Sequence, residues 1–256
     1  TLVREQAKPQ IQTETVDSFY RRTIAQLKQE GAVGNAYAYM NSYYLLKKFN
    51  DDKPLSCLFS QIDDAFLSAF ESWMRSRGNK ETTLSFQMRT LRAVFNRAVK
   101  AKIVSKEKNP FAEYKISKFN TRTPKRALSK ADIMKIVNAD CTLEKPVCRL
   151  AHDLFVFSYL CGGISFVDIA NLTPESIAEG RLIYRRQKTH GAINIPFSEQ
   201  AKVIAEKYAA YCEHAGYLFP ILNMHRHITP QQKQNRVHKV CRQVNLALQD
   251  FAKRQG

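Results

Sequence analysis

The sequence predicts a mainly helical chain of two domains, in which a bundle of amphipathic helices precedes a mixed α/β domain with a small β-hairpin. Three observations support this prediction. Apolar residues recur at helical spacing through residues 16–98, a polar stretch follows at 109–124, and a short period-two pattern lies at 182–197. We therefore expect a helical domain at 1–108, a linker at 109–124 and a second domain at 125–256.

Four helices are expected in the first domain. The first has a cap at Thr15 or Asp17 and an apolar face of Val16, Phe19, Tyr20, Ile24 and Leu27. Three more follow at about 35–49, 61–76 and 80–101, and the second of the four is rich in Tyr. Because each has one apolar stripe, packing as a four-helix bundle is the simplest arrangement.

The second domain should begin with a helix capped by Ser129, followed by a long apolar helix from Pro146 to Leu160. A Gly162-Gly163 pair ends that helix, and Ser165 caps a short helix with Asp168 at its third position. A hairpin follows, with strands at 182–186 and 192–197 and a turn at 187–191. Further helices are expected from 198 to about 213 and from 229 onward.

Positive charge is both large and concentrated. Lys and Arg number 40 against 23 Asp and Glu, which gives a net charge of +17. Residues 89–126 hold twelve basic and two acidic residues, so they contribute ten of these seventeen charges. Arg89, Arg92 and Lys100 fall near one helical face, which Gln87, Thr90 and Asn96 should share. Such a face suits phosphates and base edges, so the expected partner is double-stranded DNA.

Other classes are disfavoured. The sequence holds no run of 18 apolar residues and no signal peptide, and its first residue is not Met, so we expect a piece of a longer protein with no membrane partner. Six scattered Cys residues fit a reducing cytoplasm. His225 and His227 have no suitable neighbours for a metal, so neither a metal site nor a cofactor is expected.

Two neighbouring segments carry a resemblance to a known family. The segments 160–172 (LCGGISFVDIANL) and 181–197 (RLIYRRQKTHGAINIPF) resemble the start of the catalytic domain of tyrosine recombinases, the phage-integrase family. The segment 123–128 (TPKRAL) resembles the start of that domain in integrases of mobile elements. The resemblance implies a helical, SAM-like core-binding domain before a mixed α/β catalytic domain, the two closing as a clamp around duplex DNA. It also implies a bacterial, phage or mobile-element origin and a nucleoid-associated protein that forms dimers or tetramers on DNA.

The same resemblance assigns roles to individual residues. The family cleaves DNA with a Tyr nucleophile that forms a 3′-phosphotyrosine link, assisted by an Arg, a hairpin Lys and a His-x-x-Arg box. Lys188 matches the hairpin Lys, whereas Ser165 stands where the family has its first catalytic Arg. Arg185, Arg186 and Arg149 are candidates to supply the missing charge. The expected DNA-binding residues are Arg89, Arg92, Arg97, Lys100, Lys125, Arg126, Arg185 and Arg186.

Two expected motifs do not occur in the sequence. The last 30 residues contain no His-x-x-Arg box, and no Tyr follows Tyr217. Tyr208, Tyr211 and Tyr217 come too early for the nucleophile and are interpreted as packing residues. We therefore expect a catalytic domain that is incomplete at its C-terminus, in a piece that does not cleave DNA although its parent protein would.

Two other functions remain open. A non-catalytic DNA-binding regulator or accessory protein on the same fold is favoured by Ser165 and by the two missing motifs, whereas Lys188 argues against it. A helical adaptor that binds RNA or an acidic protein is the third reading. Competition between duplex DNA and RNA would distinguish it from a DNA clamp.

Overall fold

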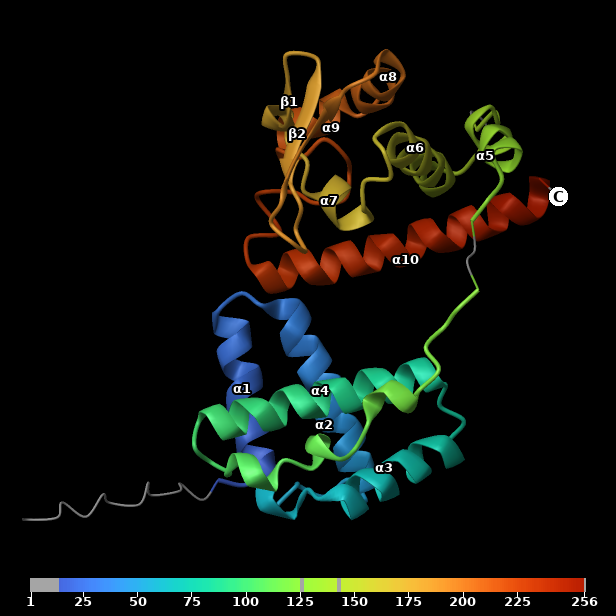
Figure 1. Ribbon diagram of the computed structural model, residues 1–256. Helices are drawn as coiled ribbons and strands as arrows, with labels where there is room; N and C mark the ends of the chain where they lie inside the picture. Colours follow the sequence, from blue (N-terminus) through green and yellow to red (C-terminus); the bar gives the residue numbers. More distant parts are fainter. Residues whose placement is uncertain (1–13, 125–126, 142–143, 256) are drawn as a thin grey trace, which may run out of the picture. The chain divides into compact units, whose positions relative to one another are not determined.

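The computed structural model describes residues 14–124, 127–141 and 144–255 (Figure 1), and these fall into two compact units that divide between residues 125 and 126. In the described residues of the first unit the regular elements are helices, with one isolated β-bridge between Thr15 and Leu58, and the second unit combines helices with one small sheet. The predicted fold class, mainly α with a helical bundle before a mixed α/β domain, is therefore confirmed. Among the described residues, no helix combines the length and the apolar character that crossing a bilayer requires.

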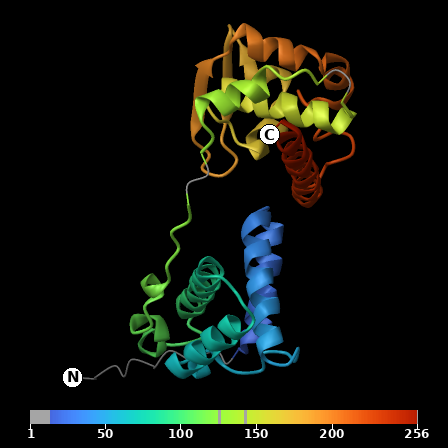
Figure 2. The ribbon, with the colours of Figure 1, turned by 90° about the vertical axis from the view of Figure 1, so that its right-hand side faces the viewer.

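The first unit contains the four predicted helices, which are α1 (Val16–Gln29), α2 (Val33–Phe49), α3 (Asp64–Ser76) and α4 (Glu81–Lys100). Thr15 caps α1, because its hydroxyl accepts a hydrogen bond from the Ser18 amide at 3.2 Å. Asp63 caps α3 in the same way, after a turn of 3₁₀ helix at Phe59–Gln61 that delays its start. The helices α1 and α2 lie side by side (Figure 2).

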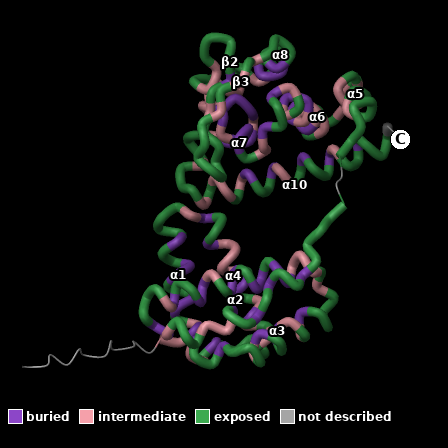
Figure 3. Tube along the Cα trace, in the orientation of Figure 1, coloured by how far each residue is buried: buried purple, intermediate pink, exposed green. Residues whose placement is uncertain are grey.

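Aromatic side chains fill the centre of this bundle. Phe59 meets the edges of both Phe19 and Phe95, with ring centroids 5.2 and 5.7 Å apart. The buried hydroxyl of Tyr20 pairs with that of Ser42 at 3.1 Å, and the Tyr43 hydroxyl donates to Asp17 at 2.6 Å. These bonds satisfy the polar ends of two buried tyrosines. Buried stretches of the chain recur along the helices of this unit (Figure 3).

The segment after α4 differs from its sequence-based prediction as a linker at 109–124. Two 3₁₀ turns, Pro110–Ala112 and Ile116–Lys118, place Phe111, Tyr114, Ile116 and Phe119 in the core of the first unit. Partial burial would raise the pKa of Glu71, yet hydrogen bonds from Lys118, Tyr114 and Arg75 hold it below its usual value. Packing of the first unit therefore extends to residue 119, beyond the predicted boundary at 108. The apolar residues at 111, 114, 116 and 119 are the signal that the polar character of this stretch masks.

The second unit follows the predicted order closely. Its helices are α5 (Lys130–Val137), α6 (Pro146–Leu160), α7 (Phe166–Ala170), α8 (Glu199–Glu206), α9 (Ala209–Ala215) and α10 (Pro230–Gln255). The strands β2 (Arg181–Arg185) and β3 (Ala192–Pro196) form the predicted hairpin, with Arg185 opposite Ala192. A two-residue strand, β1 (Ile177–Ala178), pairs with β2 and was not predicted. The three strands are antiparallel in the order β1-β2-β3.

One predicted helix is broken in two. Lys207 and Tyr208 separate α8 from α9, and both reach the buried carboxylate of Asp153 on α6, at 2.8 Å each. A buried charge is costly unless it is paired, so these two bonds hold the α8–α9 junction against α6. The long helix α10 packs along α6 (Figure 1), and its residues Val237, Val240 and Val244 complete the core.

The packing of the 110–119 segment gives a stability prediction. Phe111→Ala should lower the free energy of unfolding of the first unit by about 3 kcal/mol, because the ring is buried against Phe95 and Tyr114. Trp73 is the single Trp of the chain and lies in this unit, so its fluorescence during urea unfolding measures the loss. The matched control is Phe86→Ala, at a residue of the same helix as Phe95 that is 40% exposed. Equal midpoints for the two variants would contradict the assignment.

Candidate functional site

The outer face of α4 carries the basic residues singled out in the first unit. Arg89, Arg92, Asn96, Arg97 and Lys100 are all exposed. At 100° per residue they fall within an arc of about 140°. The opposite face holds Leu84, Leu91 and Val94 in the core, so burial of that face fixes the direction in which the cations point.

Contacts along this face leave its charges open to solvent. The Arg97 guanidinium stacks over the Tyr39 ring of α2 at 5.5 Å, and Arg89 donates to the Ser85 carbonyl oxygen of its own helix at 3.3 Å. Asn96 accepts a hydrogen bond from Asn109 at 3.1 Å. Two expected members of the face, Gln87 and Thr90, are instead buried at 7% exposure each. They lie on the core side of α4, because they precede Leu91 and Val94 by one helical turn.

In the second unit, Ser165 acts as the cap of α7. Its Oγ accepts a hydrogen bond from the Asp168 amide at 3.3 Å and donates one to Asp168 Oδ2 at 2.7 Å. The predicted cap is thus confirmed, with Asp168 at the third helical position. A Ser here supplies hydrogen bonds but no positive charge.

Asp168 connects this cap to the hairpin. Its side chain is buried, with 4% of the residue exposed, and its Oδ1 accepts a hydrogen bond from the backbone amide of Gln187 at 2.7 Å. Arg186 places its Nε 3.8 Å from Oδ2 of the same carboxylate. Ser165, Asp168 and the first residues of the 186–191 loop therefore form one connected cluster.

The cations of the hairpin differ in their surroundings. Lys188 is exposed in the turn, one residue after the Gln187 amide that Asp168 holds. Arg185 points along the loop and donates to the His190 carbonyl oxygen at 3.2 Å. Arg186 is the cation that lies beside the Ser165–Asp168 pair, and half of its side chain is exposed. Lys125 and Arg126, the other two predicted DNA-binding residues, lie outside the described residues.

Arg149 does not join this cluster. It lies near the beginning of α6, whereas Ser165 follows the end of that helix. Eleven residues separate Arg149 from Leu160, which corresponds to about 16 Å of helix. Arg149 instead lines a hollow with His152, Asp153 and Lys207. Of the three candidates for the missing charge, Arg186 is the one placed beside Ser165.

The predicted packing roles of three tyrosines are confirmed. The hydroxyl of Tyr208 donates to Asp153, and that of Tyr211 donates to the Leu222 carbonyl oxygen at 2.7 Å. Tyr217 is 8% exposed. Burial, followed by the negative charge of Asp153, raises the pKa of Tyr208 far above its usual value.

The sequence analysis does not predict a polar face on α10, because the apolar residues of that helix give the stronger pattern. Asn235, His238, Lys239, Arg242 and Asn245 are all exposed. They fall within an arc of about 120°, opposite the valines that pack on α6. Two amides, an imidazole and two cationic side chains thus share one exposed helix face. The signal is present in the sequence as polar residues at three- and four-residue spacing.

Comparison with known families places the first half of the chain. Residues 15–116 match the family model described as the phage integrase SAM-like domain. The first unit is therefore similar to the phage integrase SAM-like domain over these residues. The match ends at Ile116, which lies within the 110–119 segment that packs into the unit's core.

Solved structures extend the integrase likeness over both units. A lambda integrase dimer bound to a COC′ core site matches with a TM-score of 0.57 and 16% identity, covering 91% of this chain and 82% of that one. A lambda integrase tetramer bound to a Holliday junction gives a TM-score of 0.57 and 16% identity, over 91% and 64%. A Tn1549 transposon integrase in complex with circular intermediate DNA gives 0.54 and 17%, over 92% and 88%. At these identities the likeness shows the fold, and a search of curated proteins found no match.

The resemblance to tyrosine recombinases inferred from the sequence is confirmed by the family match and by the fold of both units. The chain has the integrase fold, with the SAM-like domain first and the hairpin-bearing unit second. The roles assigned to individual residues, from Arg89 to Lys188, remain predictions.

The Asp168 contact gives a prediction for this integrase fold. Asp168→Ala should increase hydrogen exchange at the Gln187 amide about 10- to 100-fold, because a hydrogen bond to a charged acceptor is lost. NMR exchange rates measure the effect. Asp250→Ala, at an exposed position of α10, is the control and should leave that rate unchanged. An unaltered Gln187 rate in the Asp168 variant would show that the contact does not hold the loop.

Proposed function

We propose that the chain is part of a site-specific DNA recombinase that binds duplex DNA with both units and acts through a 3′-phosphotyrosine intermediate. The observation that carries the proposal is the exposed basic face of α4 on an integrase SAM-like domain. The solved integrases of the same fold are DNA complexes, which supports DNA as the partner. Assembly into dimers or tetramers on DNA is proposed from the lambda integrase complexes.

The first unit supplies a major-groove contact in this proposal. A helix fits the major groove of B-form DNA, and Arg side chains there bind both phosphates and the acceptor edge of guanine. Arg89, Arg92 and Lys100 project from the exposed side of α4. The Tyr39 ring under Arg97 limits that guanidinium's freedom, which lowers the entropic cost of binding.

The second unit supplies a further contact through α10. Asn side chains read adenine, and Arg reads guanine or binds phosphate. Asn235, Arg242 and Asn245 occupy one exposed face, with His238 and Lys239 between them. Asp250 is the single acidic residue of α10, so most of the helix is electrostatically suited to a polyanion.

The cluster at the hairpin is the proposed cleavage region. Lys188 would protonate the leaving 5′ oxygen, and Arg186 would balance charge on the scissile phosphate in place of the Arg that Ser165 replaces. Asp168 supports both by holding the loop at Gln187. Residues 1–256 include neither a His-x-x-Arg box nor a Tyr after Tyr217, so these 256 residues alone are proposed to bind DNA without cleaving it.

A second candidate is a non-catalytic DNA-binding regulator of the same fold. The observation that favours it is the neutral cap at Ser165, which a protein without phosphoryl-transfer chemistry tolerates. Lys188 separates the two candidates, because a binder has no need of an ammonium at that position.

DNA binding by α4 has a specific salt signature. Each phosphate contact adds about 0.9 to the slope of log K against log salt concentration, so the double variant Arg89→Gln/Arg92→Gln should lower that slope by about 1.8. Fluorescence anisotropy with a labelled duplex measures it. The control, Lys48→Gln/Lys53→Gln, removes two exposed charges away from α4 and should change the slope little. Equal losses in both variants would indicate diffuse attraction rather than a binding face.

The catalytic assignment is tested in the complete product of the gene with a nicked suicide substrate. Lys188→Gln should abolish the covalent protein–DNA complex while duplex affinity changes less than about threefold, because one exposed contact is lost. Lys145→Gln is the exposed control. Ser165→Arg should preserve or raise cleavage, and a total loss would refute the equivalence of Ser165 with the family's Arg. Absence of any covalent complex in the unaltered protein would favour the regulator.

A further inference from the structure

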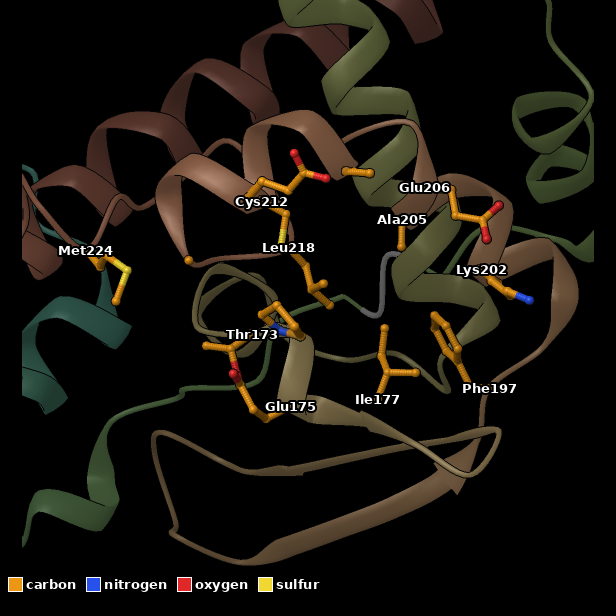
Figure 4. Close-up of a pocket in the computed structure, with 14 residues that line it drawn as sticks. Thr173, Glu175, Ile177, Phe197, Lys202, Ala205, Glu206, Cys212, Leu218 and Met224 are labelled. Atoms are coloured by element: carbon orange, nitrogen blue, oxygen red, sulfur yellow. The ribbon is translucent and has the colours of Figure 1, made fainter.

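An apolar hollow of about 660 Å³ lies in the second unit, between the start of the sheet and the helices α8 and α9 (Figure 4). Its apolar lining includes Ile177, Phe197, Ala205 and Leu218, together with the thiol of Cys212. The residues proposed to contact DNA are absent from this lining. A hollow of this size accommodates several apolar groups of a ligand.

The rim of the hollow is acidic, although the chain as a whole is strongly basic. Glu175, Glu206 and Glu213 line it, against one cation, Lys202. The Lys202 ammonium lies 3.9 Å from Glu199, which is not part of the lining. On a chain of net charge +17, a site with three carboxylates and one ammonium is a local reversal of sign.

The carboxylates act on the interior of the hollow. Burial is the first cause that raises the pKa of the Cys212 thiol, and the negative charges of Glu175 and Glu213 raise it further. Both carboxylates therefore lie close enough to Cys212 for their fields to reach it. Glu206 and Lys202 come from the α8 side, whereas Thr173 and Glu175 lie across the hollow from them (Figure 4).

One wall depends on a specific backbone conformation. Gly216 ends α9 with a φ of 72°, a left-handed value that favours glycine. The Met224 side chain lies where a Cβ on Gly216 would stand, and the Met224 amide donates to the Ala215 carbonyl oxygen at 2.9 Å. Because Met is unbranched and flexible, this wall adapts to the shape of an occupant.

We propose that this hollow binds a cationic amphipathic peptide segment of a partner protein. Apolar side chains of the segment fill the space over Leu218 and Ile177, and its Lys or Arg residues pair with Glu175, Glu206 and Glu213. The acidic rim repels DNA and anionic lipid, so neither is the occupant. Carboxylates on opposite sides of an apolar floor require an occupant that presents cations on both sides of an apolar stripe, as an amphipathic helix does.

The test uses the full 256-residue chain and two synthetic, fluorescein-labelled 14-residue peptides. Both place Leu at helical spacing, and the remaining positions are Lys in one peptide and Glu in the other. Fluorescence anisotropy should show binding of the Leu/Lys peptide that weakens with added salt, and at least tenfold weaker binding of the Leu/Glu peptide. Equal binding of the two peptides, or stronger binding of the Leu/Glu peptide, overturns the proposal.

Paired variants locate the binding. Ala209→Phe fills the hollow and should weaken binding at least tenfold, whereas Ala210→Phe, at the next exposed residue outside the lining, should not. Glu206→Lys should also weaken binding at least tenfold, whereas its control Glu199→Lys, outside the lining, should not. The Leu/Lys peptide should also protect Cys212 from iodoacetamide, as measured by peptide mapping. The proposal is overturned if the two members of a pair have equal effects, or if the peptide does not protect Cys212. It is also overturned if the chain self-associates and the peptide disrupts that association, because the occupant would then be a second copy of the chain.

Discussion

The buried carboxylate of Asp168 is the contact on which the candidate cleavage region depends. A carboxylate with so little exposure needs polar partners: Ser165 and the Gln187 amide donate hydrogen bonds to it, and Arg186 forms an ion pair with it. Two of these partners belong to the hairpin loop, and one belongs to the start of α7. Satisfying one buried charge therefore fixes the loop that carries Lys188 relative to the helix start where Ser165 stands. The proposed role of Lys188 requires this anchoring, because an exposed turn would otherwise sample many conformations.

The same principle operates in the middle of α6. Asp153 is buried and bonded to Lys207 and Tyr208, which closes the junction between α8 and α9. In the second unit, Asp153 thus stabilises the packing of the helices, and Asp168 fixes the hairpin loop. The ion pair between Lys207 and Asp153 also bears on how many cations can bind DNA. Lys207 is paired with Asp153, whereas Lys188, the cations of α4, Lys239 and Arg242 are exposed without such a buried partner. The count of 40 basic residues therefore overstates the number of groups that can bind phosphate.

Local signals made most of the fold predictable. Capping by Thr15, Ser129 and Ser165, the proline that begins α6 and the alternation of the hairpin are all short-range patterns that tertiary packing did not override. The features that the sequence analysis does not predict are those in which a side chain contacts a residue far away in the sequence. The sequence does not reveal that Asp168 reaches Gln187, nineteen residues away, or that Tyr114 reaches Glu71, forty-three residues away. Likewise, the polarity of 109–124 concealed four apolar residues that pack in the first core.

Charge placement links the two proposals for this chain. A protein that holds DNA through exposed cations cannot recruit a cationic partner through the same faces, because like charges repel and DNA occupies them. The acidic rim formed by Glu175, Glu206 and Glu213 supplies a site of opposite sign, whose lining shares no residue with the proposed DNA contacts. DNA binding and peptide binding can then occur together on one chain. Saturating the α4 face with duplex should therefore leave Cys212 accessible to iodoacetamide, whereas saturating the hollow with the Leu/Lys peptide should protect that thiol.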